Sequence, residues 1–399
     1  MDDFLMRGLA QTTLYPLNLQ VSHARGSYIH LEDGSKILDF ISGVGVSAFG
    51  HHHPEIIGAL HEQIDKHLHV MVYGEAQQHS QDLAAKRLLS FLPDNLNAVY
   101  FVNSGAEAID GALKLARRIT GRKNFMAMEG GYHGNTFGAL SISSNQSRRA
   151  PFEPLLEGVQ FIPFNSERDL SAIDESFAAV IAETVQGDAG VRIPQASWMK
   201  KLQERCHEVG ALLILDEIQC GMGRTGKPFA FDHYDIIPDI LCLGKALGGG
   251  MPLGAFVSSK SRMRSLAHEP DLGHITTFGG HPVPCASSAA ALNIMKHLDW
   301  DNIERRGDRL EQVIGQNNAV IEVRRIGFFI AVEMESAEAV HFCVEHARKN
   351  GLLIFYFLST PQAFRIAPPL NLNDIELDHG LTLLNEAFDA WRRAQLSQQ

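Results

Sequence analysis

The 399-residue sequence has few of the features that mark membrane, exported or nucleic-acid-binding proteins. No apolar run approaches the roughly 18 residues that span a bilayer. The N-terminus begins acidic and lacks the basic segment and apolar stretch of an export signal. A net charge of −11 would repel phosphate groups. We therefore expect a cytoplasmic protein whose partners include neither nucleic acid nor membrane.

Cysteine is also scarce, because the chain has only five and none forms a C-x-x-C pair. Reduced thiols are expected rather than a disulfide framework. The adjacent His51, His52 and His53 do not share one helix face and have no Cys or Asp at ligand spacing, so we expect no metal site. Serine-nucleophile (G-x-S-x-G) and zinc-protease (H-E-x-x-H) motifs are missing as well.

One stretch comes close to a phosphate-binding loop of nucleotide hydrolases. Residues 221–228 fit G-x-x-x-x-G-K, but Pro228 stands where a Ser or Thr should bind the metal. The stretch also follows an acidic strand instead of preceding one, and no helical pattern comes after it. The sequence therefore argues against a nucleotide hydrolase.

Hydrophobic residues make up 45 % and charged residues 20 %, which is ordinary for a globular protein, and the length suits two domains. Strand–helix alternation predicts an α/β domain with a mostly parallel, seven-stranded sheet covered by helices on both faces. Its strands are expected at 98–102, 124–128, 160–163, 178–182, 211–215, 240–243 and 255–258. Helices are expected at 54–68, 81–92, 104–120 and 196–209.

The pattern of the C-terminal residues predicts a smaller α+β domain. It contains expected helices at 285–297, 337–349 and from 373, and expected strands at 321–325 and 329–333. N-terminal strands at 27–31 and 37–41 should pack on it, so both chain ends would build this domain. The expected division is residues 1–55 (N-terminal segment of the small domain), 56–284 (large domain) and 285–399 (C-terminal small domain).

The apolar strand at 240–243 delivers Lys245 into a glycine-rich turn. A lysine flanked by apolar residues and glycines has little carboxylate to pair with, and desolvation lowers its pKa. The neutral amine is the state needed for a Schiff base with a carbonyl compound or an aldehyde cofactor. Another apolar strand ends in Asp216 and Glu217. Two strands ending in functional groups predict one site at the carboxyl edge of the sheet.

Other motifs each allow two interpretations. Residues 104–108 open a helix and could bind phosphate, or Ser104 could be an ordinary N-cap. Tyr132, between glycines, could stack on a planar ring or pack within its loop. Asp216 could pair with a pyridinium nitrogen or belong to a hydrolase-type acidic pair. Arg365 could be a surface residue, although its apolar neighbours favour a buried anionic partner.

The motifs and their order along the chain resemble the class III pyridoxal-phosphate aminotransferases of fold type I, in the ornithine/acetylornithine branch. The resemblance extends from Leu38 to Pro369. It implies pyridoxal 5'-phosphate as cofactor and a homodimer with active sites shared across the interface. Lys245 would hold the cofactor and move the proton, and Asp216 would keep the pyridine nitrogen protonated. Further cofactor contacts would come from Ser104, Gly105, Ala106, Tyr132, Glu183, Ile218 and Gln219, with Thr277 reaching the phosphate of the neighbouring subunit.

The resemblance also implies substrate contacts. Arg365 would bind the α-carboxylate of the amino acceptor and be masked by Asp188, where the family usually has Glu, when an ω-amino substrate binds. Asn135 replaces the arginine that usually meets the donor's carboxylate, a charge that Arg148 or Arg149 could supply. Val44 completes the predicted substrate contacts. The tyrosine of free-ornithine enzymes aligns with Leu14, although Tyr15 is adjacent.

The expected reaction moves the ω-amino group of acetylornithine, or a related ω-amino compound, to 2-oxoglutarate, giving an aldehyde and glutamate. Ornithine, 4-aminobutyrate or another ω-amine are alternative donors. An aminomutase, racemase or decarboxylase on the same fold, or a binding protein without catalysis, are further alternatives. The pair of Arg365 and Asp188 favours transamination, and the set of Lys245, Asp216 and Gln219 favours an enzyme.

Overall fold

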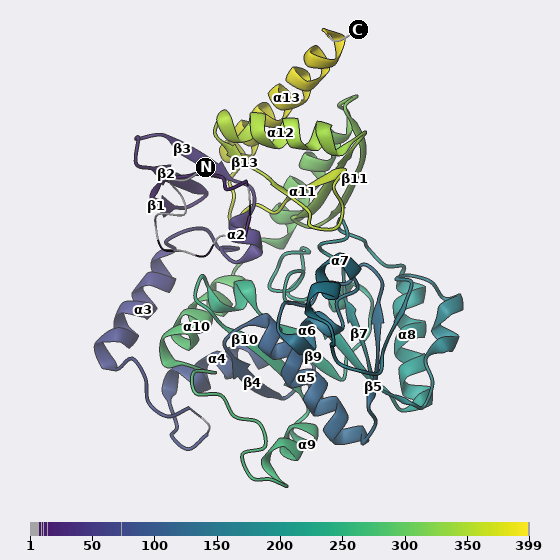
Figure 1. Cartoon of the computed structure of the whole chain (residues 1–399). Helices are drawn as coiled ribbons and strands as arrows, with labels where there is room; N and C mark the ends of the chain where they lie inside the picture. The colour runs from purple at the N-terminus through teal and green to yellow at the C-terminus, as the bar shows by residue number, and fades with distance from the viewer. Residues whose placement is uncertain (1–7, 9, 11, 14, 73, 398–399) are drawn as a thin grey trace.

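A seven-stranded sheet is the centre of the computed structural model, which describes residues 8, 10, 12–13, 15–72 and 74–397 (Figure 1). The strand order is β4-β10-β9-β8-β7-β5-β6, and all neighbours are parallel except the two pairs that involve β10. The predicted mostly parallel sheet is thus confirmed. Its strands are β4 (Ala98–Val102), β5 (Asn124–Met128), β6 (Val159–Ile162), β7 (Phe177–Glu183), β8 (Leu212–Asp216), β9 (Ile240–Leu243) and β10 (Gly254–Ser258).

Helices cover both faces of this sheet, because its apolar strands bury side chains on either side. Leu212 and Ile214 of β8 lie in one core with residues of α5, whereas Leu213 and Leu215 lie in the other core with residues of α8 and α10. The helices of this part are α3 (Pro54–Lys66), α4 (His79–Leu89), α5 (Gly105–Thr120), α6 (Phe137–Ser141), α7 (Gln146–Arg149), α8 (Ala196–Val209), α9 (Lys260–Met263) and α10 (Pro282–Lys296).

Both chain ends build the remainder, which lies above the large sheet in Figure 1. The N-terminal strands β1 (Val21–Arg25), β2 (Tyr28–Leu31) and β3 (Lys36–Asp39) form a sheet with β13 (Leu352–Leu353), which pairs parallel to β3. An antiparallel sheet, ordered β11-β12-β15-β14, holds the C-terminal strands. Its members and the accompanying helices are β11 (Val320–Ile326), β12 (Phe329–Met334), β14 (Phe355–Tyr356), β15 (Ala363–Ile366), α2 (Ser42–Gly45), α11 (Trp300–Gly315), α12 (Ala337–Lys349) and α13 (Asp374–Leu396).

The predicted boundary between residues 284 and 285 falls inside α10. This helix packs against α3 and α4 next to the large sheet, because its small residues allow close approach. We propose that the second boundary lies after α10 instead, while the other limits stay predictions. Among the described residues, no helix has both the length and the apolar character to cross a bilayer. The cytoplasmic location stays a prediction.

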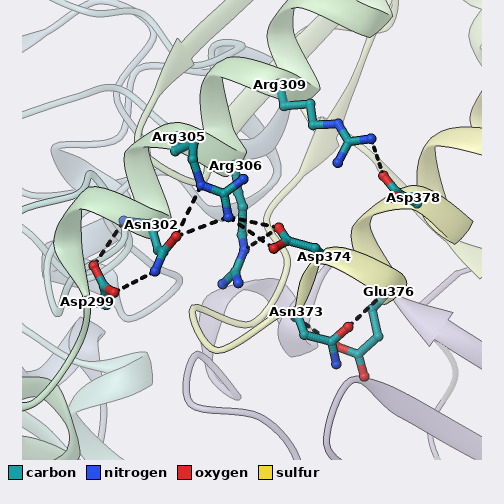
Figure 2. Close-up of polar contacts among 9 residues, drawn as sticks. All are labelled: Asp299, Asn302, Arg305, Arg306, Arg309, Asn373, Asp374, Glu376 and Asp378. Atoms are coloured by element: carbon teal, nitrogen blue, oxygen red, sulfur yellow. Dashed lines mark hydrogen bonds and ion pairs between the residues drawn. The ribbon is translucent and has the colours of Figure 1, made fainter.

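Charged side chains fasten α11 to α13 (Figure 2). Arg305 Nη2 and Arg306 Nε donate to Asp374 at 3.0 and 2.9 Å, and Arg309 Nη2 lies 2.5 Å from Asp378. Hydrogen bonds from Arg306 and Arg305 lower the pKa of Asp374 to about 2. A carboxylate in the first turn of α13 also suits the positive end of the helix dipole.

The adjacent histidines have contacts that belong to the fold. His51 Nε2 lies 2.8 Å from Asp39 Oδ2, and the His53 ring accepts the Glu55 N–H as the N-cap of α3. The five cysteines are buried and unpaired. These residues therefore act in packing and local hydrogen bonding.

Candidate active site

The carboxyl ends of β7, β8 and β9 meet at one edge of the large sheet. The three strands are parallel neighbours, and Glu183 at the end of β7 is in register with Asp216 at the end of β8. Lys245 follows β9 after a single glycine, Gly244. The topology thus places an amine and two carboxylates at the same edge, where parallel sheets usually bind ligands.

A cavity of about 250 Å³ opens at this edge. It brings together most of the predicted cofactor contacts and three residues to which the sequence assigned no role, His133, Gly134 and Cys220. The lining residues are Gly105, Ala106, Tyr132, His133, Gly134, Asn135, Glu183, Asp216, Ile218, Gln219, Cys220 and Lys245.

Lys245 is held in an unusual backbone conformation at the start of the 3-10 turn η4 (Lys245–Gly248). Its φ of 45° lies in the left-handed region, which costs a non-glycine residue about 1–2 kcal/mol. Burial lowers the pKa of Lys245 below its ordinary value, although the charge of Asp216 opposes this shift. The amine is therefore easier to deprotonate than that of an exposed lysine.

Two donors hold the carboxylate of Asp216. The backbone N–H of Ile218 donates to Oδ1 at 2.9 Å, and His133 Nδ1 lies 2.7 Å from Oδ2. Burial alone would lower the pKa of His133, but the hydrogen bond to Asp216 and its charge outweigh burial and raise it. His133 therefore orients the carboxylate of Asp216.

Glu183 joins the loop of Tyr132 to the end of β7. Its carboxylate accepts the backbone N–H of Tyr132 at 3.0 Å and that of Gly187 at 2.8 Å. Burial, together with the nearby charge of Asp216, raises the pKa of Glu183 to about 7. Glu183 therefore sets the position of the tyrosine loop in addition to lining the cavity.

Glu217, next to Asp216, points away from this cavity into the protein. It accepts hydrogen bonds from Thr184 Oγ1 at 2.9 Å and from the N–H groups of Ala230 and Phe231, both at 2.7 Å. Burial raises its pKa to about 8. Because both members of this acidic pair follow one strand, the sequence alone could not tell which of them faces the site.

The start of α5 forms another wall. Ser104 is the N-cap and its Oγ accepts the Glu107 N–H at 3.2 Å, so the ordinary capping interpretation of this serine is realised. A Cβ atom on Gly105 would lie 2.8 Å from Ile218, so the absence of a side chain permits this packing. Unpaired N–H groups at a helix start attract phosphate.

Arg365 and Asp188 form a buried pair. Arg365 Nη2 lies 3.3 Å from Asp188 Oδ1, and Nε donates to the carbonyl oxygen of Tyr356 at 3.1 Å. The guanidinium carbon lies 4.6 Å from the centre of the Phe357 ring. Burial lowers the pKa of Arg365, and its charge in turn helps to lower that of Lys245. The predicted anionic partner of Arg365 is therefore Asp188.

Asn135 donates its amide to the Tyr132 hydroxyl at 3.4 Å. Of the two arginines considered as replacements for a missing charge, Arg149 lies over the Phe161 ring at 4.9 Å. Arg148 is half-buried and close enough to Tyr132 for its charge to affect the pKa of that hydroxyl. Of the two, Arg148 is therefore the closer candidate.

Other predicted residues lie outside the cavity lining. Val44 has a φ of 63° and is 37 % exposed. Thr277 is exposed, and its carbonyl oxygen lies 3.0 Å from His69 Nε2. Leu14 lies outside the described residues, and Tyr15 is 86 % exposed. Val44, Thr277 and Tyr15 are therefore not among the residues that line the cavity of Lys245 and Asp216.

Comparison with known proteins identifies the family. Residues 10–388 match the class III aminotransferase family. The acetylornithine aminotransferase of Methanopyrus kandleri is 38 % identical, and the match covers 92 % of this chain and 93 % of that protein. The putrescine aminotransferase of Pectobacterium atrosepticum is 37 % identical, with 90 % and 79 % covered.

Solved structures agree with these matches. An ornithine aminotransferase structure from Toxoplasma gondii, with PLP partially occupying its active site, has a TM-score of 0.87 and 28 % identity, covering 98 % of this chain and 94 % of that one. The predicted fold type I architecture, with its large sheet and smaller second domain, is therefore confirmed. The chain belongs to the class III aminotransferases and is a transaminase.

Proposed function

We propose that this chain moves the ω-amino group of acetylornithine, or of a related ω-amino compound, to 2-oxoglutarate. One observation carries the proposal: the amine of Lys245 and the carboxylate of Asp216 line one cavity whose size suits a single small ring. Arg365, buried nearby, supplies the cation that a keto-acid carboxylate requires.

The residues present suit pyridoxal 5'-phosphate. The start of α5 provides backbone donors for a phosphate, and Gly105 lets Ile218, a predicted ring contact, pack against this helix end without a clash. When bound, this cofactor supplies an aldehyde that reacts with amines and a ring that accepts the electron pair released by C–H cleavage. Tyr132, Ile218 and Gln219 are the side chains that would contact its ring.

The chain's own groups have separate tasks in this proposal. Lys245 presents an amine with a lowered pKa, which can bond to an aldehyde and can take up and return a proton. Asp216, held by His133, provides a fixed negative charge that would keep a proton on a ring nitrogen. Arg365 would hold the carboxylate of 2-oxoglutarate, and Asp188 sets how much of its charge is available.

The donor is the least constrained part of the proposal. Asn135 is uncharged, so the position that commonly holds an arginine offers no cation to a donor carboxylate. This favours a donor whose distal end either binds Arg148 or is recognised without a charged partner. The named relatives include acetylornithine and putrescine aminotransferases at nearly equal identity. Acetylornithine remains our first choice because the sequence motifs resemble that branch.

A donor screen tests the proposal. The purified enzyme with its cofactor would be supplied with 2-oxoglutarate and with acetylornithine, ornithine, 4-aminobutyrate or putrescine, and glutamate would be measured. We expect the highest kcat/KM with acetylornithine. If putrescine were preferred by tenfold or more, the substrate assignment would be wrong while the reaction class would stand. If no amine produced glutamate, the acceptor assignment would fail as well.

We also propose a homodimer in which Thr277 reaches the phosphate site of the other subunit. The segments around this residue expose apolar side chains, including Leu68 (59 %), Met71 (52 %), Ile275 (50 %) and Phe278 (56 %). Such a concentration of apolar surface is typical of an interface between subunits. His69 links the two segments through the carbonyl of Thr277.

A further inference from the structure

Asp188 is held more closely by a turn than by its arginine. The Leu358 N–H donates to Asp188 Oδ1 at 2.8 Å, and the Ser359 hydroxyl donates to Oδ2 at 2.7 Å. The contact from Arg365 Nη2 to Oδ1 is longer, at 3.3 Å. Both carboxylate oxygens are therefore engaged without Arg365.

The turn that holds Asp188 is itself anchored. Asn145, before α7, donates its amide to Ser359 Oγ at 3.3 Å. Thr360 Oγ1 donates to the backbone oxygen of Asp188 at 3.4 Å. The Asp188 side chain is only 6 % exposed, so water cannot readily replace its partners. Movement of Asp188 away from Arg365 would leave two donors in the turn without their acceptor.

One end of the Arg365 guanidinium has no hydrogen-bond acceptor among the described residues. Tyr356 takes the single N–H of Nε, and Asp188 takes one N–H of Nη2. Among the described residues, no acceptor contacts Nη1 through a hydrogen bond. A carboxylate can therefore bind the end of the guanidinium formed by Nη1 and the second N–H of Nη2 while Asp188 remains in place.

We propose that Asp188 is a fixed counter-ion of Arg365, clamped by Leu358 and Ser359, and that the substrate carboxylate binds at Nη1 without displacing it. This inference rests on the proposed function, because it concerns how that site admits 2-oxoglutarate. Asp188, which is shorter than the usual Glu and is held by two donors in the turn, thus stays in place instead of moving away from Arg365. The negative charge stays beside Arg365 in both half-reactions.

The substitution Asp188→Asn tests whether the negative charge of Asp188 opposes binding of the acceptor at Arg365. Asn keeps the shape, its oxygen still accepts the Leu358 N–H, and its amide can donate to Ser359 Oγ, so the clamp remains. A fixed acid repels the incoming carboxylate, so removing its charge should lower the KM for 2-oxoglutarate about tenfold. If the KM for 2-oxoglutarate did not fall, the charge of Asp188 would not oppose the acceptor and the proposal would fail. A structure with a bound dicarboxylate then distinguishes a fixed acid from a displaced one.

Thr360→Val is the matched control, because among the described residues the Thr360 hydroxyl donates only to the backbone oxygen of Asp188 and not to its carboxylate. It should leave the KM for 2-oxoglutarate unchanged; a fall equal to that of Asp188→Asn would assign the effect to the turn and overturn the proposal. A crystal structure of the wild-type holoenzyme with glutarate, an unreactive dicarboxylate, provides a second readout. Asp188 should stay within hydrogen-bond distance of the Leu358 N–H, and displacement from it would refute a fixed acid. The structure with glutarate shows whether Asp188 is fixed even if no amine donor proves active. Failure of the donor screen would instead concern only the proposed function.

Discussion

At the scale of single residues, the carboxylate of Asp216 is fixed in orientation, because His133 and the Ile218 N–H each bind one of its oxygens. Asp216→Ala should retain some cofactor but lose most turnover, by about 10²–10³-fold, because a fixed charge opposite the reacting centre is lost. The measurement is kcat together with bound cofactor. Asp235→Ala, which removes a carboxylate that is 95 % exposed, is the control and should keep wild-type turnover. Near-normal turnover in Asp216→Ala would contradict the role.

Glu217 makes the stability of the fold depend on pH. Its pKa is raised by burial from 4.5 to about 8, so the folded chain keeps a proton that the unfolded chain releases. Its contribution is fully present below about pH 4.5 and is lost as the pH rises through 8. Denaturant unfolding should therefore show stability falling between pH 5 and 8, with a decrease on the order of 3 kcal/mol from this group.

The variant Glu217→Gln removes this titration, so its stability should change less over the same pH range. Glu157→Gln, at an exposed position, serves as the comparison and should follow the wild type. Equal pH slopes in Glu217→Gln and the wild type would show that Glu217 is ionised in the folded protein over this range.

The roles of residues were predictable where a chemically reactive or charged side chain stands at the end of a predicted strand. Lys245 and Asp216 stand at strand ends with few alternatives, and the sequence indicated both. The support from His133 and the clamp of Ser359 on Asp188 depend on residues 83 and 171 positions apart in the chain. Local patterns do not report such distances, so these contacts required the three-dimensional structure.

Among the elements, the start of α5 packs tightly against Ile218. A Cβ on Gly105 would lie 2.8 Å from Ile218, so Gly105→Ala should shift that side chain into the cavity and weaken cofactor binding, by about tenfold or more. A cofactor titration followed by absorbance measures this. Gly58→Ala in α3 meets no atom within 4 Å and should bind cofactor normally while gaining up to about 1 kcal/mol of stability. Unchanged affinity in Gly105→Ala would remove this wall from the proposed site.

The strands and longer helices were largely predictable, because long apolar runs and clear helix ends specify them. For example, β4, β5, β9, α8 and α12 have the predicted limits. The helix α11 and the strands β1, β13, β14 and β15 were not predicted. Strands β13 to β15 have only two or four residues, which carry too little pattern to indicate a strand, and β13 and β15 pair with strands far away in the chain.

For the whole molecule, we expect a dimer in solution. Burial of the apolar segments around Leu68 and Phe278 should hold it together, so sedimentation should give twice the mass of 44.0 kDa at micromolar concentration. Phe278→Asp should shift the protein toward the monomer and reduce its activity, because Thr277 would no longer reach the other subunit. Exposed Phe152, which is 56 % accessible and lies outside these segments, provides the control Phe152→Asp. A fully active wild-type monomer would contradict shared active sites.

The most direct test of the account is to locate the lysine that bonds to the cofactor. Borohydride treatment of the holoenzyme reduces a bond between pyridoxal phosphate and a lysine, and peptide mass spectrometry then identifies the modified residue. The account predicts the added mass on the peptide that contains Lys245, and its loss in Lys245→Ala. Stoichiometric modification of a different lysine in the wild type would contradict it.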